Sequence, residues 1–367
     1  MKITINRKEL ASIATIVSKT AIKPSKTSDG FLGVESDGKM LHIFGKDLSD
    51  DCIGTDMQIA IPNSEKFDVV YLDAKLLTGI LKKLKSPTIE LTIDDTGNVL
   101  ITGGKTTCGM KTVDVSDIEK PCYENFKPVL EISEKKLRDM LEATLFAIRV
   151  DTLKSILTGE CFEVENNTFS IISCCEYRMA LETTTVQKAI DSRFIVPANT
   201  LKQLLNVLGD GVCKVSLAGE LVCFTGDNYK VSSKLIEGNF PNYEAWIPSE
   251  VKIISTVKSD DIKEYVDLTK LFKAESKVPV ICTIEDNVMT FSYETGKGLC
   301  EKKIEADISG GEIKIGMAAD SLLDFVKHMK TNKVTLSFKN CRNVIIFTAD
   351  ERPSFTGVLM PIFLRNE

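Results

Sequence analysis

The segment that comes nearest to a site for chemistry is Gly103-Gly104-Lys105-Thr106. A phosphate-binding loop has the pattern G-x-x-x-x-G-K-[ST], in which backbone N–H groups surround the phosphates and the lysine reaches them. In this chain the position of the first glycine is occupied by Val99. The segment also lies between two predicted strands, whereas a phosphate-binding loop precedes a helix. We therefore interpret it as a hairpin turn and predict no nucleotide site.

Histidine is the usual residue for acid–base chemistry, and this chain has only two. His42 lies in a predicted strand and His328 near the end of a predicted helix. Neither has the spacing of a metal ligand, and their separation argues against a histidine triad. The paired carboxylates Asp94-Asp95 and Asp260-Asp261 fit a turn and a helix start. The sequence therefore predicts no catalytic residues, no metal and no cofactor.

The composition is that of an ordinary globular protein of 367 residues, 43% hydrophobic, with a formal net charge of −6. This length predicts two or three domains, and the negative charge argues against a surface that is basic all round. The eleven cysteines show no C-x-x-C spacing, which is typical of reduced thiols in a cytoplasmic protein. We find no signal peptide and no apolar run of about 18 residues, so we expect no membrane partner.

A repeat organises the elements that would position any functional residue. The motif P-x-Y-E begins at Pro121 and again at Pro241, 120 residues later. Four residues can recur by chance, but the order of predicted elements repeats as well, three times along the chain. The predicted helices span 7–21, 74–84, 134–148, 197–208, 260–273 and 318–329, and the predicted strands include 107–115, 155–164 and 354–364. We predict an α+β fold with domains at 1–127, 128–249 and 250–367, either separate or sharing sheets edge to edge.

Positive charges gather on the predicted helices and their flanks. These residues are Arg7, Lys8, Lys19, Lys23, Lys26, Lys75, Lys82, Lys83, Lys135, Lys136, Arg138, Arg149, Lys154, Lys202, Lys263, Lys270, Lys327 and Lys330. In a chain of negative net charge, this distribution indicates a positive face made by helices. Any single lysine among them can equally be solvated helix surface.

Three segments match the patterns of a known family: MKITINRKEL at the start, SKLIEGNFPNYEAWIP at 233–248, and VLMPIFLRNE at 358–367. The second is close to S-K-L-[IV]-[ED]-G-x-F-P-[DN]-Y and the third to V-M-P-[MI]-R-L. On these segments, the whole chain resembles the bacterial DNA sliding clamp, the beta subunit of the replicative DNA polymerase III.

The resemblance implies three similar α+β clamp domains per chain. It places antiparallel sheets outside and two helices per domain around the hole of a ring, which two chains form head to tail. A protein of this kind performs no chemistry. It encircles duplex DNA, keeps the polymerase on its template, and docks replication and repair proteins.

The chain departs from the family pattern at three places. Family members commonly read T-D-G-H-R-L where this chain has Cys174-Cys175-Glu176-Tyr177-Arg178-Met179. Phe363 replaces the arginine of the C-terminal motif, and Ala198 and Asn199 stand where basic residues are often found. These differences predict a divergent clamp whose partner pocket is narrower and less basic than usual.

The resemblance also implies three sets of site residues. The contacts with DNA phosphates are Lys23, Lys26, Lys82, Arg149, Lys154 and Lys202. In the dimer, the edge strand 107–113 pairs with the third domain of the other chain, and Cys108 and Met110 face Leu271 and Phe272. Short peptides of polymerases and clamp-loader subunits bind between the second and third domains, in a pocket lined by Leu157, Cys174, Arg178, Met179, Pro241, Trp246, Val344, Val358, Leu359, Met360, Pro361 and Ile362.

Each assignment has a structural alternative. The pattern C-x-M puts Cys108 and Met110 on one face of a strand, which can also be buried within its own domain. The apolar C-terminal residues can simply seal the last sheet. For the whole chain, the alternatives to a clamp are a clamp-like scaffold without DNA function and an enzyme with an unrecognised site. The helical lysines favour the clamp over the scaffold, and the lack of a catalytic constellation argues against the enzyme.

Overall fold

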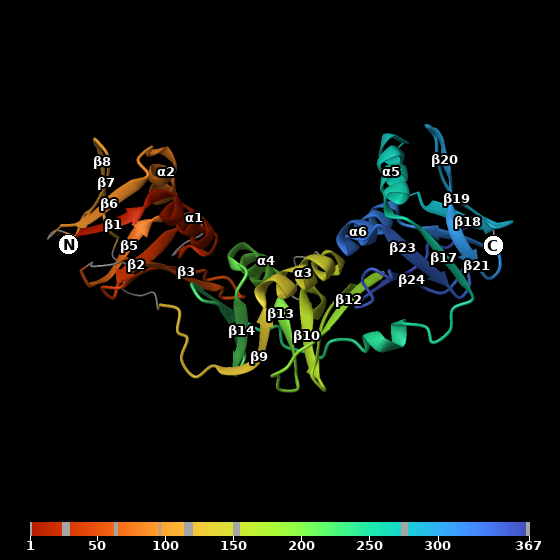
Figure 1. Ribbon diagram of the computed structural model, residues 1–367, viewed down its shortest axis with the longest axis horizontal. Helices are drawn as coiled ribbons and strands as arrows, with labels where there is room; N and C mark the ends of the chain where they lie inside the picture. Colours follow the sequence, from red (N-terminus) through yellow and green to blue (C-terminus); the bar gives the residue numbers. More distant parts are fainter. Residues whose placement is uncertain are drawn as a thin grey trace. The chain divides into compact units, whose positions relative to one another are not determined.

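Figure 1 shows the structure, a computed structural model that describes residues 2–23, 30–61, 65–94, 97–113, 120–149, 155–272 and 278–364. The elements of the first third are β1 (Lys2–Asn6), α1 (Arg7–Val17), the 3-10 helix η1 (Ser18–Thr20), β2 (Phe31–Ser36), β3 (Met40–Lys46), β4 (Gly54–Ala60), β5 (Phe67–Asp73), α2 (Ala74–Lys83), β6 (Thr88–Ile93), β7 (Val99–Gly103) and β8 (Thr106–Met110). The elements of the second third are β9 (Lys127–Ser133), α3 (Glu134–Thr144), η2 (Leu145–Ala147), η3 (Ile156–Thr158), β10 (Gly159–Glu165), β11 (Thr168–Cys175), β12 (Arg178–Thr185), β13 (Ser192–Pro197), α4 (Ala198–Val207), β14 (Val212–Ala218), β15 (Leu221–Thr225), β16 (Tyr229–Lys234) and η4 (Tyr243–Trp246). The elements of the last third are β17 (Ile253–Lys258), α5 (Ser259–Thr269), η5 (Lys270–Phe272), β18 (Val280–Glu285), β19 (Val288–Thr295), β20 (Gly298–Ile304), β21 (Ala306–Ser309), β22 (Ile313–Met317), α6 (Ala319–Met329), β23 (Lys333–Phe338), β24 (Ile345–Thr348) and β25 (Phe355–Leu359).

The strands repeat one pattern of neighbours in each third of the chain. The four-strand orders are β1-β6-β7-β8 and β5-β2-β3-β4, then β9-β14-β15-β16 and β13-β10-β11-β12, then β17-β23-β24-β25 and β22-β18-β19-β20. Strand β21 is an addition that pairs with the free side of β17. The predicted α+β class with antiparallel sheets is confirmed.

Two pairs of these four-stranded units join edge to edge. Strand β4 pairs antiparallel with β16, where Thr55 lies opposite Val231. Strand β12 pairs antiparallel with β25, where Ala180 lies opposite Gly357. The products are one eight-stranded and one nine-stranded sheet. Of the two arrangements that the sequence left open, the structure has the shared sheets.

Judged by its contacts, the chain forms two compact units. One holds Met1–Arg138, Val186–Ile190 and Val196–Ile236, and the other holds Asp139–Thr185, Asp191–Ile195 and Glu237–Glu367. The dividing line runs through the middle third, because each of its two sheets continues into a different neighbour. The three-domain division at 127/128 and 249/250 therefore stays a prediction, which the repeated strand order supports.

The six predicted helices are present, with shorter ends than predicted. Helices α1, α3 and α5 each give way to a 3-10 turn, η1, η2 and η5. Pro197 was predicted in the first turn of a helix but is the last residue of β13, directly before α4. None of the helices in the described ranges has the length and apolar character needed to cross a membrane.

Three predicted strands were too long, and the one predicted at 107–115 ends at Met110. The strand predicted at 155–164 begins only at Gly159, because the Ser155 hydroxyl accepts the N–H of Leu157 and turns the chain into η3. The strand predicted at 354–364 ends at Leu359. Pro361 has no N–H to donate to a neighbouring strand, which limits the ladder at that point.

An arginine closes the C-terminus of the second helix in every third of the chain. Arg7 donates to the carbonyl of Leu81 at 2.8 Å, Arg138 donates to that of Leu208, and Arg352 donates to that of Met329 at 3.2 Å. The last carbonyls of a helix have no partner within the helix and carry partial negative charge, so a guanidinium satisfies both needs. Arg7 and Arg138 therefore serve the fold, although the sequence grouped them with the positive helical face.

The two P-x-Y-E motifs also have a common structural role. Lys230 lies 4.9 Å from the ring centre of Tyr123, and Arg193 lies 5.9 Å from that of Tyr243. The Tyr243 hydroxyl donates to Glu163 at 2.6 Å. Each tyrosine thus fixes the segment that leaves its third of the chain, with a cation over its ring. This equivalence supports duplication over chance recurrence.

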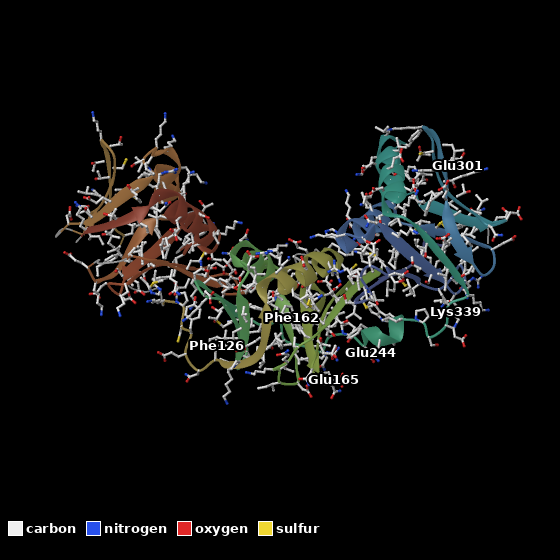
Figure 2. All side chains as sticks on the ribbon, viewed as in Figure 1. Phe126, Phe162, Glu165, Glu244, Glu301 and Lys339 are labelled. Carbon is white, nitrogen blue, oxygen red and sulfur yellow. The ribbon has the colours of Figure 1, made fainter. Side chains whose placement is uncertain are left out.

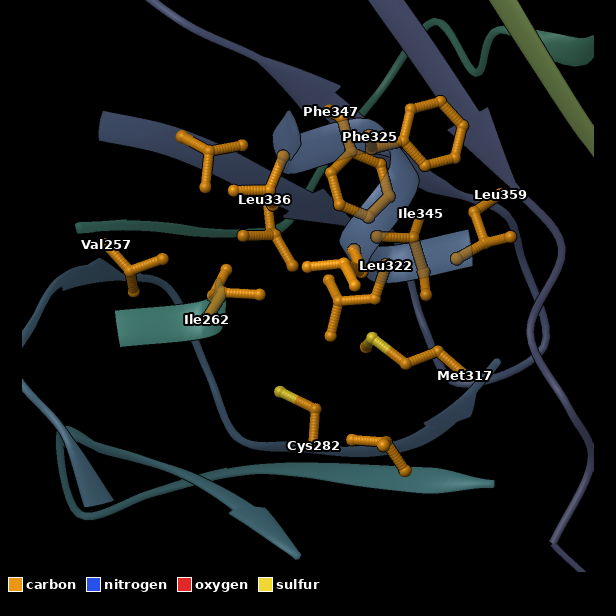
Figure 3. Close-up of a cluster of buried hydrophobic side chains, with 14 of the residues drawn as sticks. Val257, Ile262, Cys282, Met317, Leu322, Phe325, Leu336, Ile345, Phe347 and Leu359 are labelled. Atoms are coloured by element: carbon orange, nitrogen blue, oxygen red, sulfur yellow. The ribbon is translucent and has the colours of Figure 1, made fainter. Parts of the chain in front are cut away.

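The core of the last third contains side chains from both of its sheets and from α5 and α6 (Figure 3). Phe325 of α6 stacks on Phe347 of β24, with ring centres 4.5 Å apart. A side chain at Gly357 would come within 2.6 Å of the Phe325 ring. Gly357 lies opposite Ala180 in the pairing of β25 with β12. Phe325 can pack against this part of the joint because both residues are small.

A buried ion pair ties the same joint together. Arg352 Nε lies 2.9 Å from Glu182 Oε2, and the Glu182 side chain is fully buried. The Ser354 hydroxyl donates to the other carboxylate oxygen at 2.7 Å. The guanidinium also donates to the carbonyl of Asp139 in the middle of α3 and to that of Met329 at the end of α6. With its hydrogen bonds satisfied, this pair links β12, the segment before β25, α3 and α6.

Arg352→Ala should lower the free energy of unfolding by about 3–5 kcal/mol, because it leaves the buried carboxylate of Glu182 without its partner. Urea unfolding followed by circular dichroism measures the change. Arg342→Ala removes an exposed arginine and is the matched control, with an expected change within about 0.5 kcal/mol. Equal midpoints for the Arg352 variant and the control would show that the pair does not hold the joint.

Candidate functional site

A cavity of about 680 Å³ lies in the second compact unit. Its walls come from the start of β12, the segment after η4, the turn between β23 and β24, and the end of β25. The lining residues are Glu176, Tyr177, Arg178, Ala245, Trp246, Ile247, Pro248, Ser249, Lys339, Asn343, Val344, Val358 and Met360. The predicted pocket residues that the structure brings together here are Arg178, Trp246, Val344, Val358 and Met360.

Three predicted pocket residues are instead buried in the nine-stranded sheet. Cys174, Met179 and Leu359 are at most 1% exposed, and Cys174 lies directly opposite Met179 in the β11–β12 pair. Burial raises the pKa of the Cys174 thiol to about 12, so this cysteine is not a reactive group. They do not line this cavity, because the strands that carry them are central in the sheet and covered by the core, and their part in a partner pocket stays a prediction.

Four further predicted residues, Leu157, Pro241, Pro361 and Ile362, also lie outside the cavity lining. After Met360 the chain turns toward β22, where the N–H of Ile362 donates to the carbonyl of Gly316 at 2.8 Å. A side chain at position 316 would meet the Ile362 carbonyl at 2.6 Å, so this approach requires a glycine. Pro361 and Ile362 therefore seal the last sheet, as the structural alternative held, whereas Met360 lines the cavity.

Arg178 is anchored at the cavity wall by partners behind it. Its Nη1 donates to Asp324 of α6 at 2.7 Å, and its Nη2 donates to the carbonyl of Phe146. The guanidinium lies 5.4 Å from the Phe146 ring centre and 5.7 Å from that of Tyr177. Its Nε–H is buried without an acceptor among the described residues. The charge is thus balanced by Asp324, and the Nε–H is enclosed by the protein.

The rim carries Glu176 and Tyr177, two residues of a segment in which this chain departs from the family pattern. Glu176 Oε1 forms an ion pair of 2.6 Å with Arg149, so this predicted DNA contact is engaged at the cavity. Tyr177 and Met360 are exposed apolar groups, and the N–H of Met360 donates to the carbonyl of Tyr177. The cavity mouth therefore combines a neutralised carboxylate with an apolar surface.

Sequence reasoning missed part of the lining. Ala245, Ile247, Pro248 and Ser249 belong to the aromatic–proline run that begins with Tyr243, and that run was a usable signal. Lys339 comes from a turn about 90 residues away in sequence, and only the pairing of β23 with β17 brings it near this run. No local pattern in the sequence marks it.

A second hollow, of about 1020 Å³, lies in the first compact unit between α2 and the edge strand β8. Its lining is Asp73, Lys75, Leu76, Gly79, Ile80, Lys83, Leu84, Lys85, Ser86, Gly103, Gly104, Thr106 and Cys108. Cys108 is half-buried in this lining, so part of its side chain remains exposed. Gly103 and Gly104 form the turn between β7 and β8, which agrees with the hairpin interpretation.

Met110 does not reach this surface. It pairs with Val99 across β7 and β8, and both side chains belong to the core of the first unit. Cys108 and Met110 do share a face of the strand, but that face turns inward and Met110, at its end, is 2% exposed. Within one chain Met110 therefore packs inside its own domain, and its contact with a partner chain stays a prediction that this burial does not favour.

At the other end of the chain, an apolar surface surrounds η5 and the edge strand β20. Leu271 is 73% exposed, and Leu268 and Leu299 are also large exposed apolar residues. Phe272 is partly buried against the core of the last third and lies 3.5 Å from where a side chain on Gly298 would begin. Exposed apolar residues grouped in this way mark an interaction surface.

Among the predicted DNA contacts, Lys23, Lys82 and Lys202 are exposed. Lys82 lies in the last turn of α2 and Lys202 in α4. Lys26 and Lys154 lie outside the described residues. Within the described ranges there is no group of histidine, cysteine and carboxylate side chains that could hold a metal ion.

The comparisons with known proteins agree on one family. Residues 131–242 match the model of the DNA polymerase III beta subunit, central domain, and residues 244–363 match that of its C-terminal domain. The beta sliding clamp of Bacillus subtilis is 22% identical over 365 residues, with 97% of this chain and 94% of the relative covered.

Solved structures give the same answer for the fold. A Pseudomonas aeruginosa sliding clamp bound to griselimycin superposes with a TM-score of 0.92 at 19% identity, covering 99% of this chain and 100% of that one. The beta subunit of Streptococcus pyogenes DNA polymerase has a TM-score of 0.91 at 18% identity, with the same coverage.

The fold is therefore that of the DNA sliding clamps. The two matched models together span more than half of the chain, so the chain belongs to the family of the bacterial DNA polymerase III beta subunit. Its function is that of a sliding clamp in DNA replication, a non-catalytic accessory subunit of the polymerase. The alternative of a scaffold without DNA function is not favoured.

Proposed function

We propose that two copies of this chain close head to tail around duplex DNA and present a cavity to short peptides of polymerase and clamp-loader subunits. The observation that carries the ring is the rule by which the thirds join. We count the strands within each third and leave out the added strand β21. The fourth strand of one third then pairs with the eighth strand of the next, as β4 does with β16 and β12 with β25. Applied once more, the rule pairs β20 with β8.

Strands β20 and β8 are the edges that this rule leaves over within one chain. An unpaired edge strand presents backbone groups that another chain can pair with. Next to β8 is the hollow lined by Leu76, which is half exposed. Next to β20 are Leu271 and Leu299, the apolar groups that would fill it. Glu301, labelled in Figure 2, marks the middle of β20.

Leu271→Ala with Phe272→Ala should convert the dimer to monomers, because the apolar contact beside β20 is lost. Sedimentation velocity measures the change. Since Phe272 also packs on its own core, Leu271→Glu alone is the sharper variant and should likewise give monomers. Ile190→Ala, at another exposed apolar residue, is the control and should remain dimeric. Dimers in both Leu271 variants would rule out this contact.

The DNA-binding role rests on exposed lysines of the helical elements. With a net charge of −6, the protein cannot hold DNA by its overall charge, so the positive groups must be gathered on the surface that meets DNA. Contacts with phosphates position a duplex without reading its sequence, as a moving ring requires. Lys23, Lys82 and Lys202 are the described candidates, and Arg149 contributes less because Glu176 neutralises it.

Replacing Lys23, Lys82 and Lys202 by serine should weaken DNA binding and reduce its salt dependence, by about 0.9 in the logarithmic slope per lost phosphate contact. Loading on DNA at several salt concentrations gives the slope. A control with serine at Lys127, Lys188 and Lys234, which are exposed and not on helices, has the same net charge and should keep the slope. Unchanged processive synthesis and slope in the first variant would refute the assignment.

The cavity of about 680 Å³ has the size and chemistry of a peptide site. Trp246, Val344 and Met360 supply apolar walls for leucine or phenylalanine anchors. Arg178, which also lines the cavity, is the proposed donor to a peptide carbonyl. A cytoplasmic location is part of the proposal, since all eleven cysteines are free thiols.

Deleting residues 360–367 should abolish binding of a labelled Leu- and Phe-containing peptide, measured by fluorescence anisotropy, and leave the dimer intact. The deletion also removes the Ile362–Gly316 bridge, so Met360→Ala with Val344→Ala, which keeps the backbone and changes two lining residues, is the second variant. We expect at least a tenfold loss of affinity there, about 1.4 kcal/mol, for two apolar contacts. Undiminished affinity in both variants would place the peptide site elsewhere.

A further inference from the structure

Another cavity, which we call the second cavity, adjoins the proposed peptide site and is distinct from the hollow between α2 and β8. It measures about 600 Å³ and lies at the end of the last third, where β17, β18, β22 and β23 begin or end. Its lining is Lys252, Ile253, Thr283, Ile284, Glu285, Gly311, Glu312, Ile313, Lys314, Lys339, Asn340 and Cys341. Lys339 lines both cavities, so the two are neighbours separated by one turn.

The separating ridge is the turn 339–344 between β23 and β24. One side of it, Lys339 to Cys341, faces the second cavity, and the other side, at Asn343 and Val344, faces the peptide cavity. The Asn340 side chain accepts the N–H groups of Arg342 at 2.9 Å and Asn343 at 3.0 Å. These bonds fix the turn, so the ridge is preformed and does not have to order on binding.

Three cations gather at this ridge. Lys339 and Arg342 belong to the turn, and Lys252 is held beside them because its N–H donates to the carbonyl of Phe338 at 2.8 Å. None of the three forms an ion pair with another described residue. By contrast, two other charged groups at the peptide cavity are paired, Arg178 with Asp324 and Glu176 with Arg149.

The walls of the second cavity show what could lie there. Ile253, Ile284 and Ile313 are buried and give it an apolar floor. Glu285, at the end of β18, and Glu312, directly before β22, belong to the same lining, and Lys314 has a partner of its own. The three cations of the ridge outnumber these two carboxylates, and Lys339, labelled in Figure 2, is the cation that the two cavities share.

We propose that this clamp recognises partner segments longer than the anchor peptide, in which acidic residues next to the anchor cross the ridge of Lys252, Lys339 and Arg342 and lead into the second cavity. The inference rests on the proposed peptide site and adds the chemistry of the partner beside it. Two paired strands lie about 5 Å apart and an extended chain advances about 3.3 Å per residue, so crossing the ridge takes about two residues.

The test compares two labelled peptides that share a Leu- and Phe-containing anchor. One carries a tail of aspartates and the other a serine tail of equal length, and each is made with the tail at either end. With the unaltered full-length protein, the aspartate peptide should bind about three- to tenfold more tightly than its serine partner in one of the two orientations. Raising the salt concentration should shrink this advantage.

Serine at Lys252 and Arg342, neither of which lines the peptide cavity, should remove most of the advantage and leave the serine peptide nearly unaffected. The control with serine at Lys127 and Lys188 loses the same charge in the other compact unit and should keep the advantage. An aspartate tail that adds nothing, or whose advantage survives in the ridge variant, would overturn the inference and leave the peptide site standing. If neither peptide binds, the peptide site itself fails, and the inference fails with it.

Discussion

Sheet edges are the constraint on which this structure depends. A strand at an edge exposes N–H and C=O groups that must be paired, covered or kept short. Each third of the chain builds two four-stranded units, and the chain pairs the edges that these leave open through β4–β16 and β12–β25. Edge pairing therefore explains why three repeats give only two compact units, and why the edges left at β8 and β20 are the natural place for a second copy.

The joint between β12 and β25 also creates the functional surface. There the buried Glu182–Arg352 pair fixes the sheet, and Arg178, at the start of β12, is held against α6 by Asp324. Trp246 and the residues after it enter from the segment that connects the second and last thirds. The cavity is thus made of rigid strand ends with one connecting segment, an arrangement that suits recognition of short peptides.

Most of the fold could be predicted from sequence because it rests on local periodicity and repetition. The six helical stripes and the two P-x-Y-E motifs were readable, and Asp73 caps α2 by accepting the N–H of Leu76, as its residue type suggests. The site was predicted less well, because burial depends on the sheet's neighbours. Met110 and Cys174 have the right spacing in sequence, but β7 and the nine-stranded sheet cover them. Lys339 and Arg342 gave no local signal at all, since their position depends on strand pairing across the last third.

The central claim is that the chain holds DNA by enclosing it and not by affinity. Labelled protein would be loaded onto a nicked circular plasmid by a clamp-loader fraction, separated from free protein at physiological salt, and then exposed to a nuclease that cuts the plasmid once. The account predicts that the protein stays on the circle and is lost after linearisation, because a ring slides off a free end. Equal retention on circular and linear DNA would contradict enclosure and would show that the protein is held by direct contacts.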